Sequence, residues 1–280
     1  NQDILINTTT AETRVAVLEN RRIEEIYIER QSNLGLVGNI YLGKVVRVLP
    51  GMQSAFIEIG LERTAFLHVA DMAIATHSPT ASQTAVNQLP PIETQLFDGQ
   101  TVLVQVIKDP IGTKGARLST KISIAGRLLV YLPKEEGIGV TQKVDSDEER
   151  MALKNQMIEL LGDHPNGGYI IRTAALDAAV EEWQNDINYL KRTWQEINEQ
   201  KRKRSAPTLI HRDLTLAQRV LRDMVTQDTQ SVICDNADTL QQLQAFAQTY
   251  MPSVLPRLKL APVERPLFDT YEVEEEINRS

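Results

Sequence analysis

The segment from residue 37 to residue 120 constrains the fold most, because short β-like runs alternate there with turn-forming residues. The runs are NIYLGKVVRV, MQSAFIEI, RTAFLHV and GQTVLVQVIKDP, and Gly or Pro breaks the chain at 49–51 and 60–62. In the last run Val102, Val104 and Val106 fall on one face. Short strands at close spacing, separated by glycine turns, predict a small five-stranded barrel of the OB or S1 kind.

Residues 73–96 interrupt this pattern. Ser, Thr, Ala, Gln and Pro dominate the segment AIATHSPTASQTAVNQLPPIETQ. Such a composition buries little apolar surface, so we expect a long mobile loop within the barrel domain.

The two ends of the chain together show the element order of a single domain. The first thirty residues contain the β-like runs ILINTT, TRVAVLE and RIEEIYIE, and the C-terminal part contains LTLAQRVLRDMV, SVICD, ADTLQQLQAFAQTYM and RLKLA, which read as helix, strand, helix and strand. The combined order, three strands followed by helix, strand, helix and strand, is that of an RNase H-like fold. The intervening residues are then one long insertion, which exposed loop tips tolerate.

Residues 121–215 show a mixed pattern. Strand-like runs are GRLLVYLP, GIGVTQKV and GGYIIRTAA, and Ser146 with Glu149 predicts a capping box before the helical run ERMALKNQMIELLG. In the later helix, from 181 to 204, a stripe at helical spacing should face the core: Trp183, Ile187, Leu190 and Trp194.

The sequence thus predicts a multidomain α+β protein. We assign residues 1–36 to the first part of the RNase H-like domain, 37–120 to the S1 barrel, 121–215 to the mixed domain and 216–280 to the second part of the RNase H-like domain.

Composition narrows the class of protein. The chain is 42% hydrophobic and 24% charged, as soluble globular proteins are. No run of 18 apolar residues and no signal peptide is visible, so we expect a cytoplasmic protein. The single cysteine, Cys234, excludes a disulfide within the chain and a cysteine-based zinc site. A net charge of −7 argues against bulk electrostatic coating of nucleic acid but permits a local basic patch.

The barrel carries the clearest binding signal. Phe56 and Phe66 flank one tight turn, where a barrel can expose both rings for base stacking, worth about 1–3 kcal/mol per base. The segment 108–121 contains four basic residues and only one acidic residue, Asp109. The basic residues form a positive stripe suited to phosphates: Lys108, Lys114, Arg117 and Lys121. An equally open alternative places both Phe residues in the barrel core and makes the basic residues a solvated face.

A second candidate is the pair Arg172 and Thr173 in GGYIIRTAA. A guanidinium binds phosphate oxygens in a bidentate manner, a hydroxyl adds a donor, and the nearby Gly167 and Gly168 would permit close backbone approach. A purely structural role for the pair is the alternative.

Acidic residues decide whether the RNase H-like part could be a nuclease, since a two-metal mechanism needs several convergent carboxylates. Asn7 stands where such enzymes place an aspartate in the first strand, and only Asp235 lies near a suitable position. We expect Asp235 to cap or precede the next helix, with Asp238 as the N-cap. The scattered histidines, His68, His77, His164 and His211, lack metal-like spacing. This domain is therefore predicted to be a non-catalytic scaffold.

Four segments carry a family resemblance. GNIYLGKVVRVLPGMQSAFIEIGLERTAFLHVADM, VQVIKDPIGTKGARLST, GGYIIRTA and LAQRVLRD resemble the ribonuclease E/G family, nearer its ribonuclease G branch. The resemblance implies an endoribonuclease that cuts single-stranded, A/U-rich RNA in rRNA maturation and mRNA turnover. It also implies a preference for 5′-monophosphorylated ends.

The family pattern assigns roles to particular residues. Phe56 and Phe66 match its S1 aromatics, and Lys108 and Lys114 match its basic positions. The 5′-phosphate sensor matches Gly126, Val130, Arg172 and Thr173. Two positions depart from the ribonuclease E pattern: Gln142 replaces an arginine of the sensor region, and Ile59 replaces an aromatic residue of the S1 domain.

The same pattern places catalysis elsewhere. Its metal-binding aspartates lie on a later DNase I-like domain, followed by a Cys-x-x-Cys element that shares Zn²⁺ between protomers, and neither occurs before Ser280. The resemblance implies Mg²⁺-dependent hydrolysis and a homo-oligomer for the full-length parent, with no catalytic or metal-binding residue in this chain. The acidic run at 274–280 looks cut, so we expect a fragment without cleavage activity.

Two other functions compete with this one. The chain could be a stand-alone S1 module that anchors RNA for another machine. Alternatively, the RNase H-like part could be an active nuclease that uses Asp235.

Overall fold

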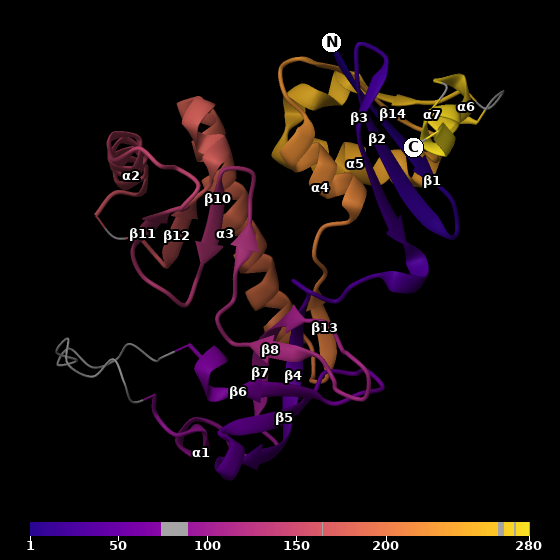
Figure 1. The fold of residues 1–280 in the computed structure, drawn as a ribbon. Helices are drawn as coiled ribbons and strands as arrows, with labels where there is room; N and C mark the ends of the chain where they lie inside the picture. The colour runs from indigo at the N-terminus through magenta and orange to yellow at the C-terminus, as the bar shows by residue number, and fades with distance from the viewer. Residues whose placement is uncertain (74–88, 164, 263–265, 272, 280) are drawn as a thin grey trace. The chain divides into compact units, whose positions relative to one another are not determined.

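The computed structural model describes residues 1–73, 89–163, 165–262, 266–271 and 273–279. The chain divides into two compact units (Figure 1). Unit 1 contains residues 1–34 and 214–280, and unit 2 contains residues 35–213.

Unit 1 is built on a five-stranded sheet of order β15-β14-β1-β2-β3. Its strands are β1 (Gln2–Thr8), β2 (Glu12–Glu19), β3 (Arg22–Arg30), β14 (Thr229–Cys234) and β15 (Leu258–Leu260). The first three strands are antiparallel, whereas β14 pairs parallel with both β1 and β15. The hairpin between β2 and β3 turns on Asn20 and Arg21, both in the left-handed region with φ of 52° and 66°, as a two-residue turn that matches strand twist requires.

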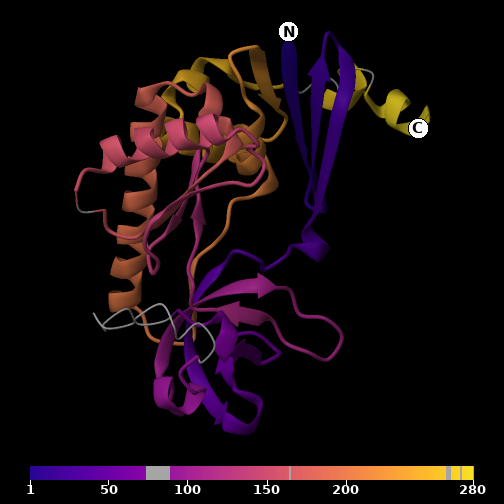
Figure 2. The same cartoon turned by 60° about the vertical axis from the view of Figure 1, so that its left-hand side comes forward.

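Helices cover both faces of this sheet. They are α4 (Leu216–Met224), α5 (Ala237–Tyr250), α6 (Leu267–Thr270) and α7 (Val273–Arg279). Helices α4 and α5 lie on one face, and α6 with α7 lies on the other (Figures 1 and 2). On the second face Leu5 and Leu18 pack against Phe268 and Val273, all of them buried. The acidic C-terminal helix is therefore anchored to unit 1 through Val273.

Five strands of unit 2 close into an OB-like barrel. They are β4 (Ile40–Leu49), β5 (Ser54–Glu58), β6 (Ala65–His68), β7 (Thr101–Lys108) and β8 (Arg117–Ser119). The sheet order β4-β5-β6-β8-β7 closes through pairing of β4 with β7. The predicted five-stranded barrel is thus confirmed. A sixth strand that the sequence pattern did not predict, β13 (Thr208–His211), adds to β4 from outside the ring.

The loop predicted for residues 73–96 needs a correction at its C-terminal end. Most of it, including His77, lies outside the described residues, as His164 does. Residues Ile92–Gln95, however, form the short helix α1. Ile92 and Leu96 stand four residues apart on one face of this helical turn, and both are buried in the barrel core.

The rest of unit 2 combines a small sheet with two helices. The sheet has the order β11-β12-β10-β9, with β9 (Ile124–Ala125), β10 (Leu129–Leu132), β11 (Ile138–Val140) and β12 (Gly168–Ile171). The helices are α2 (Asp147–Leu161) and α3 (Val180–Lys203). The capping box predicted for α2 is confirmed in part: the Ser146 hydroxyl accepts a hydrogen bond from Glu149 N at 3.3 Å, but among the described contacts the Glu149 side chain does not accept the Ser146 backbone N–H in return.

The predicted apolar stripe of α3 faces the core. Trp183, Ile187 and Leu190 are buried, and Trp194 is half-buried, with the Lys134 ammonium 5.9 Å from the centre of its ring. Short 3-10 helices complete the fold: η1 (Gln31–Asn33), η2 (Pro50–Met52), η3 (Val69–Asp71), η4 (Thr173–Asp177) and η5 (Pro252–Arg257).

Candidate nucleic-acid interface

A row of directly paired residues crosses the barrel from β4 to β7. From one end to the other the row consists of Arg47, Phe56, Phe66, Arg117 and Lys108, each paired with the next. Successive side chains of a strand point to opposite faces of a sheet. The strand neighbours of the two Phe residues, Ala55, Ile57, Ala65 and Leu67, are buried in the barrel core. This aromatic–cationic row therefore lies on the outside of the barrel.

The two aromatic rings of the row are accessible. Phe56 is 42% exposed and Phe66 is half-buried, so the alternative that places both rings in the core is wrong. Ile59 is buried among the core residues and adds nothing to this surface. Two adjacent rings open to solvent, with cations on both sides, form a platform on which bases can stack.

The predicted basic stripe splits into two kinds of residue. Lys108 and Lys114 are exposed. Arg117 donates from Nε to Asp71 Oδ2 at 2.9 Å, and Lys121 donates from Nζ to Ala70 O at 3.2 Å. The first pair thus offers charge to a ligand, while the second pair also holds η3 against the barrel.

Arg47 is a member of the row that the sequence pattern did not reveal. Strict alternation from the buried Val45 would place Arg47 in the core. The register shifts between Val45 and Arg47, where a β-bulge inserts Val46, and an extra residue reverses the side-chain alternation. As a result Arg47 is exposed beside Phe56.

The second group of predicted residues gathers around the turn between β9 and β10, residues 126–128, which we call the sensor turn after its predicted role. Arg172 donates from Nη1 to Gly126 O at 2.5 Å and to Arg127 O at 3.3 Å, and its backbone N–H donates to Leu128 O at 2.7 Å. Thr173 follows as the exposed first residue of η4. The half-buried Val130 is the second residue of β10, which follows the turn, so all four predicted sensor residues lie on adjoining segments.

A buried carboxylate holds this turn from inside. Asp186 on α3 is 3% exposed and accepts the backbone N–H groups of Arg127, Leu128 and Leu129 at 3.0, 3.0 and 2.9 Å. A Cβ on Gly126 would stand 2.4 Å from Asp186 Oδ1, so only glycine fits there. Sequence reasoning missed Asp186, because on α3 it reads as one more polar residue of a charged helix.

Gly167 and Gly168, predicted to permit close backbone approach, are crowded by other parts of the protein. Gly167 has a φ of +96°, and a Cβ on it would lie 2.7 Å from Tyr131 Cε2. A Cβ on Gly168 would lie 3.3 Å from the backbone of Glu135. The protein's own atoms approach both glycines, and burial raises the pKa of the Tyr131 hydroxyl packed there. Gln142, the departure from the sensor pattern, is exposed two residues after β11.

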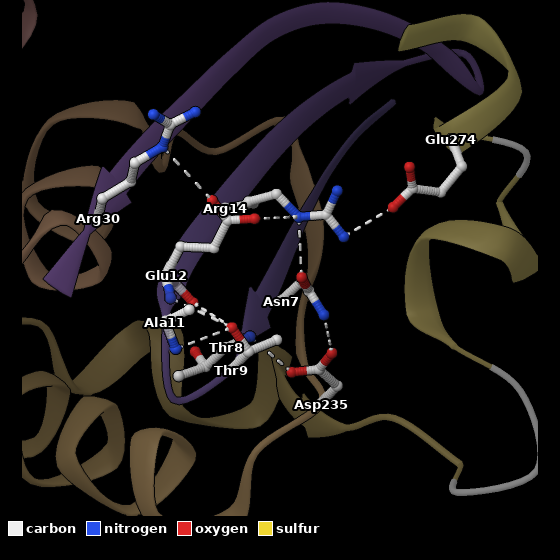
Figure 3. A network of polar contacts seen from close by, with 9 residues as sticks. All are labelled: Asn7, Thr8, Thr9, Ala11, Glu12, Arg14, Arg30, Asp235 and Glu274. Carbon is white, nitrogen blue, oxygen red and sulfur yellow. Dashed lines mark hydrogen bonds and ion pairs between the residues drawn. The ribbon is translucent and has the colours of Figure 1, made fainter. Parts of the chain in front are cut away.

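Unit 1 contains a polar network around Asp235, the one acid that the sequence pattern placed near a possible nuclease position (Figure 3). Asp235 Oδ2 accepts Asn7 Nδ2 at 2.5 Å, and its Oδ1 accepts Thr8 N at 2.9 Å. Asn7 Oδ1 in turn accepts Arg14 Nε at 2.9 Å, and Arg14 Nη2 pairs with Glu274 at 2.7 Å. Both oxygens of Asp235 therefore tie the end of β1 to the segment after β14.

The helix after this network begins differently from the prediction. The N-cap of α5 is Asn236, whose side chain accepts Thr239 N at 3.0 Å. Asp235 precedes the helix, as expected, but Asp238 lies in the first turn and is not the cap. Among the described residues no cluster of three His, Cys, Asp or Glu side chains is placed to hold a metal ion.

The histidines that the structure describes have local roles. His68 Nδ1 accepts Ala70 N at 3.0 Å and so caps η3. His211 is half-buried on β13, where burial lowers its pKa, opposed by the charges of Asp213 and Glu196.

Comparison with known proteins gives the family. A family model described as the ribonuclease E/G family matches residues 123–280. The chain is 41% identical over 275 residues to ribonuclease G of Haemophilus influenzae and 40% identical over 278 residues to ribonuclease G of Escherichia coli K12. These alignments cover 98% and 99% of the chain but 56% of each relative.

A more distant relative is ribonuclease E of Escherichia coli K12, which is 34% identical over 278 residues, covering 98% of the chain and 26% of that protein. The chain thus spans about half the length of the ribonuclease G relatives and a quarter of this one. Within the described residues no helix is both long and apolar enough to cross a membrane. The match of the family model, with identities of 34–41% along nearly the whole chain, shows that this protein belongs to the ribonuclease E/G family.

Proposed function

We propose that this chain is the RNA-binding and 5′-monophosphate-sensing part of a single-strand-specific endoribonuclease. The observation that carries the proposal is the aromatic–cationic row. Phe56 and Phe66 pair directly on the outer face of the barrel, between Arg47 on one side and Arg117 with Lys108 on the other. Rings that stack on bases and cations that attract phosphates are the two elements of sequence-tolerant binding to a single strand.

In this proposal each part of the chain has one role. The barrel, within residues 37–120, is an S1 domain that holds single-stranded RNA. Residues 121–215 form the 5′-sensor domain, and residues 1–36 with 216–280 form an RNase H-like scaffold. The order of helices and strands in unit 1, with β1 between β14 and β2, supports the last assignment.

The sensor turn is the proposed site for the 5′ phosphate. Arg172 brings a guanidinium that the carbonyls of Gly126 and Arg127 hold through Nη1, and the exposed Thr173 follows it directly. A cation held in a fixed orientation distinguishes a phosphate from a hydroxyl by charge and by hydrogen-bond geometry. Gly126, whose carbonyl accepts the Arg172 guanidinium, and the half-buried Val130 complete the proposed site.

We place the hydrolytic chemistry of the parent enzyme outside this chain. Mg²⁺-dependent hydrolysis needs convergent acidic ligands. Among the described residues no such cluster is found, and Asp235 is engaged by Asn7 and Thr8. The proposed parent is a cytoplasmic homo-oligomer that acts on rRNA precursors and mRNA, with Mg²⁺ and a shared Zn²⁺ bound by residues beyond these 280.

A binding titration tests this proposal. Single-stranded RNA of about ten nucleotides, with a 5′ monophosphate or a 5′ hydroxyl, is titrated with the wild-type chain, and blunt duplex RNA serves as the control. We expect tighter binding of the 5′-monophosphorylated strand and the weakest binding of the duplex. Equal affinity for all three would contradict the proposal.

A cleavage assay with Mg²⁺ separates the alternatives. We expect no cleavage by the 280-residue chain alone. Cleavage that Asp235→Asn abolishes would instead favour an active RNase H-like nuclease. Binding of single strands without any preference for the 5′ phosphate would favour a stand-alone S1 module.

A further inference from the structure

The C-terminal end of α3 carries a basic tract that the proposed function leaves unexplained. Lys201, Arg202 and Lys203 form the last turn of the helix, Arg204 is the C-cap, and all four are exposed. We call these residues the 201–204 tract. Arg204 donates from Nη1 to Leu209 O at 2.7 Å. In the part of the chain that the structure describes, the charged groups of the other three make no hydrogen bond or ion pair with the protein.

Helix electrostatics explains only part of this charge. The C-terminal end of a helix carries about half a negative charge, which one or two cations neutralise. Four consecutive cations exceed that requirement, and they occur in a chain whose net charge is −7. Such a concentration of positive charge attracts a polyanion.

The 201–204 tract lies close to the barrel surface that carries the aromatic–cationic row. Helix α3 runs from the small sheet to the barrel, where its C-terminal end lies beside β13 (Figures 1 and 2). Pro207 follows three residues after Arg204, and a Cβ on Gly60 would stand 3.9 Å from Pro207 Cβ. Gly60 lies in the turn between β5 and β6, the two strands that carry Phe56 and Phe66. The tract and the aromatic pair therefore adjoin the same hairpin.

Chain geometry limits the distance between the two surfaces. Phe56 precedes Gly60 by four residues, or about 13 Å of extended strand. Lys203 precedes Pro207 by four residues, so it lies at most about 14 Å along the chain from the contact with Gly60. The turn itself adds the exposed cation Arg63. Barrels of the OB type bind about 4–16 nucleotides, so a strand seated on the row is long enough to reach the tract.

We propose that the 201–204 tract is a second phosphate-binding surface, which takes single-stranded RNA after it leaves the aromatic–cationic row over the β5–β6 turn. The proposal rests on the proposed function, because the row must first seat the strand. The tract adds affinity through counterion release without reading sequence. Its contribution depends on RNA length, since a strand that covers only the row ends before the tract.

The test compares two double variants of the whole chain on RNA of about five and about sixteen nucleotides. Lys201→Gln with Lys203→Gln removes two charges from the tract and leaves the hydrogen bond of Arg204 to β13 intact. Lys143→Gln with Lys154→Gln is the matched control, since both lysines are exposed in unit 2, after β11 and on α2. Lys201→Arg with Lys203→Arg preserves the charge, and thermal unfolding checks that every variant is folded.

For the tract variant we expect affinity for the longer RNA to fall about threefold to tenfold. The slope of log Kd against log salt concentration should fall by about 1.4, because each phosphate contact of a single strand contributes about 0.7. Affinity for the short RNA should stay the same, and the control and the arginine variants should bind both RNAs like the wild type.

Three results would overturn the proposal: unchanged affinity of the tract variant for the longer RNA, an equal loss for short and long RNA, or an equal loss in the matched control. The variant Phe56→Ala with Phe66→Ala is measured in parallel. If it weakens binding of the short RNA while the tract variant binds like the wild type, the proposed function stands and only the tract assignment fails. If it leaves binding unchanged, the proposed function itself fails.

Discussion

Phe56 on β5 and Phe66 on β6 pair directly across the two strands, with Arg47 and Arg117 as their outer neighbours. The barrel therefore presents two adjacent rings and not two isolated ones. In the proposed function two successive bases of one strand stack side by side on these rings, and the exposed Arg47 lies where it can attract a phosphate.

Alanine substitution tests the stacking surface. We expect Phe56→Ala and Phe66→Ala each to weaken binding of single-stranded RNA by about 1–3 kcal/mol, or roughly fivefold to 150-fold, because each ring contributes the stacking of one base. The loss should be similar for different sequences, since every base has a face that can stack. Fluorescence anisotropy with short labelled RNA measures it.

A matched control is Phe246→Ala, which removes a partly exposed ring from α5 in unit 1. It should leave RNA affinity unchanged. Wild-type affinity in both barrel variants would show that the rings serve only the packing of the barrel surface.

Arg172 is expected to decide the response to the 5′ end. Arg172→Ala should abolish the preference for 5′-monophosphorylated over 5′-hydroxyl RNA, because it removes the guanidinium held by Gly126 O and Arg127 O. Arg172→Lys should restore part of the preference, since an ammonium keeps the charge but loses the planar geometry. Competition between the two RNAs provides the measurement, and an undiminished preference in Arg172→Ala would refute the assignment of the sensor.

Asp186 should act as a positioning residue for that sensor. Asp186→Asn keeps the size of the side chain but replaces one acceptor oxygen by an NH₂ group that faces a backbone N–H. We expect a loss of about 2–3 kcal/mol in the free energy of unfolding, typical of a buried hydrogen bond to a charged group. The preference for the 5′ phosphate should weaken as well, because the sensor turn loses its support.

Affinity for 5′-hydroxyl RNA separates this effect from general unfolding. It should stay at the wild-type value in Asp186→Asn, because the barrel has its own core. Gly126→Ala should act in the same direction, since its Cβ would meet Asp186 Oδ1 at 2.4 Å. A stable Asp186→Asn variant with full 5′ preference would contradict the positioning role.

The sequence predicted the barrel and the element order of unit 1 because both depend on local patterns. Alternation of apolar residues fixes which side chains enter a core, as at Val104 and Val106. The prediction failed at two positions where the folded structure departs from the local sequence rule. The bulge at Val46 turned Arg47 outward, and Asn236 took the capping position expected for Asp238.

The candidate sites were predictable only in part. The Phe residues and Arg172 belong to recognisable motifs. Asp186, in contrast, lies 57–59 residues from the N–H groups that it accepts, and no spacing along the chain reveals such a contact. Strand β13 was missed for a similar reason: four residues show little pattern, and their pairing with β4 depends on α3 bringing the chain back to the barrel.

Substitution of Asp235 tests whether unit 1 is a non-catalytic scaffold. Asp235→Asn should lower the melting temperature by several degrees, because the carboxylate accepts both Asn7 Nδ2 and Thr8 N and hydrogen bonds to a charged group contribute about 1.5–3 kcal/mol. RNA affinity should not change, since the row and the sensor turn belong to unit 2. Reduced RNA affinity in a folded Asp235→Asn variant would give unit 1 a direct role in binding.

We expect Cys234 to make the stability of unit 1 sensitive to alkaline pH. The thiol is fully buried on β14, and burial raises its pKa from 9.0 to about 11. Between these values the folded chain retains a proton that the unfolded chain has lost, so the free energy of unfolding must fall as pH rises from about 9 to about 11. The melting temperature of the wild type should therefore fall more steeply over this range than that of Cys234→Ala, which lacks the group. Parallel slopes for the two proteins would show that the thiol does not contribute.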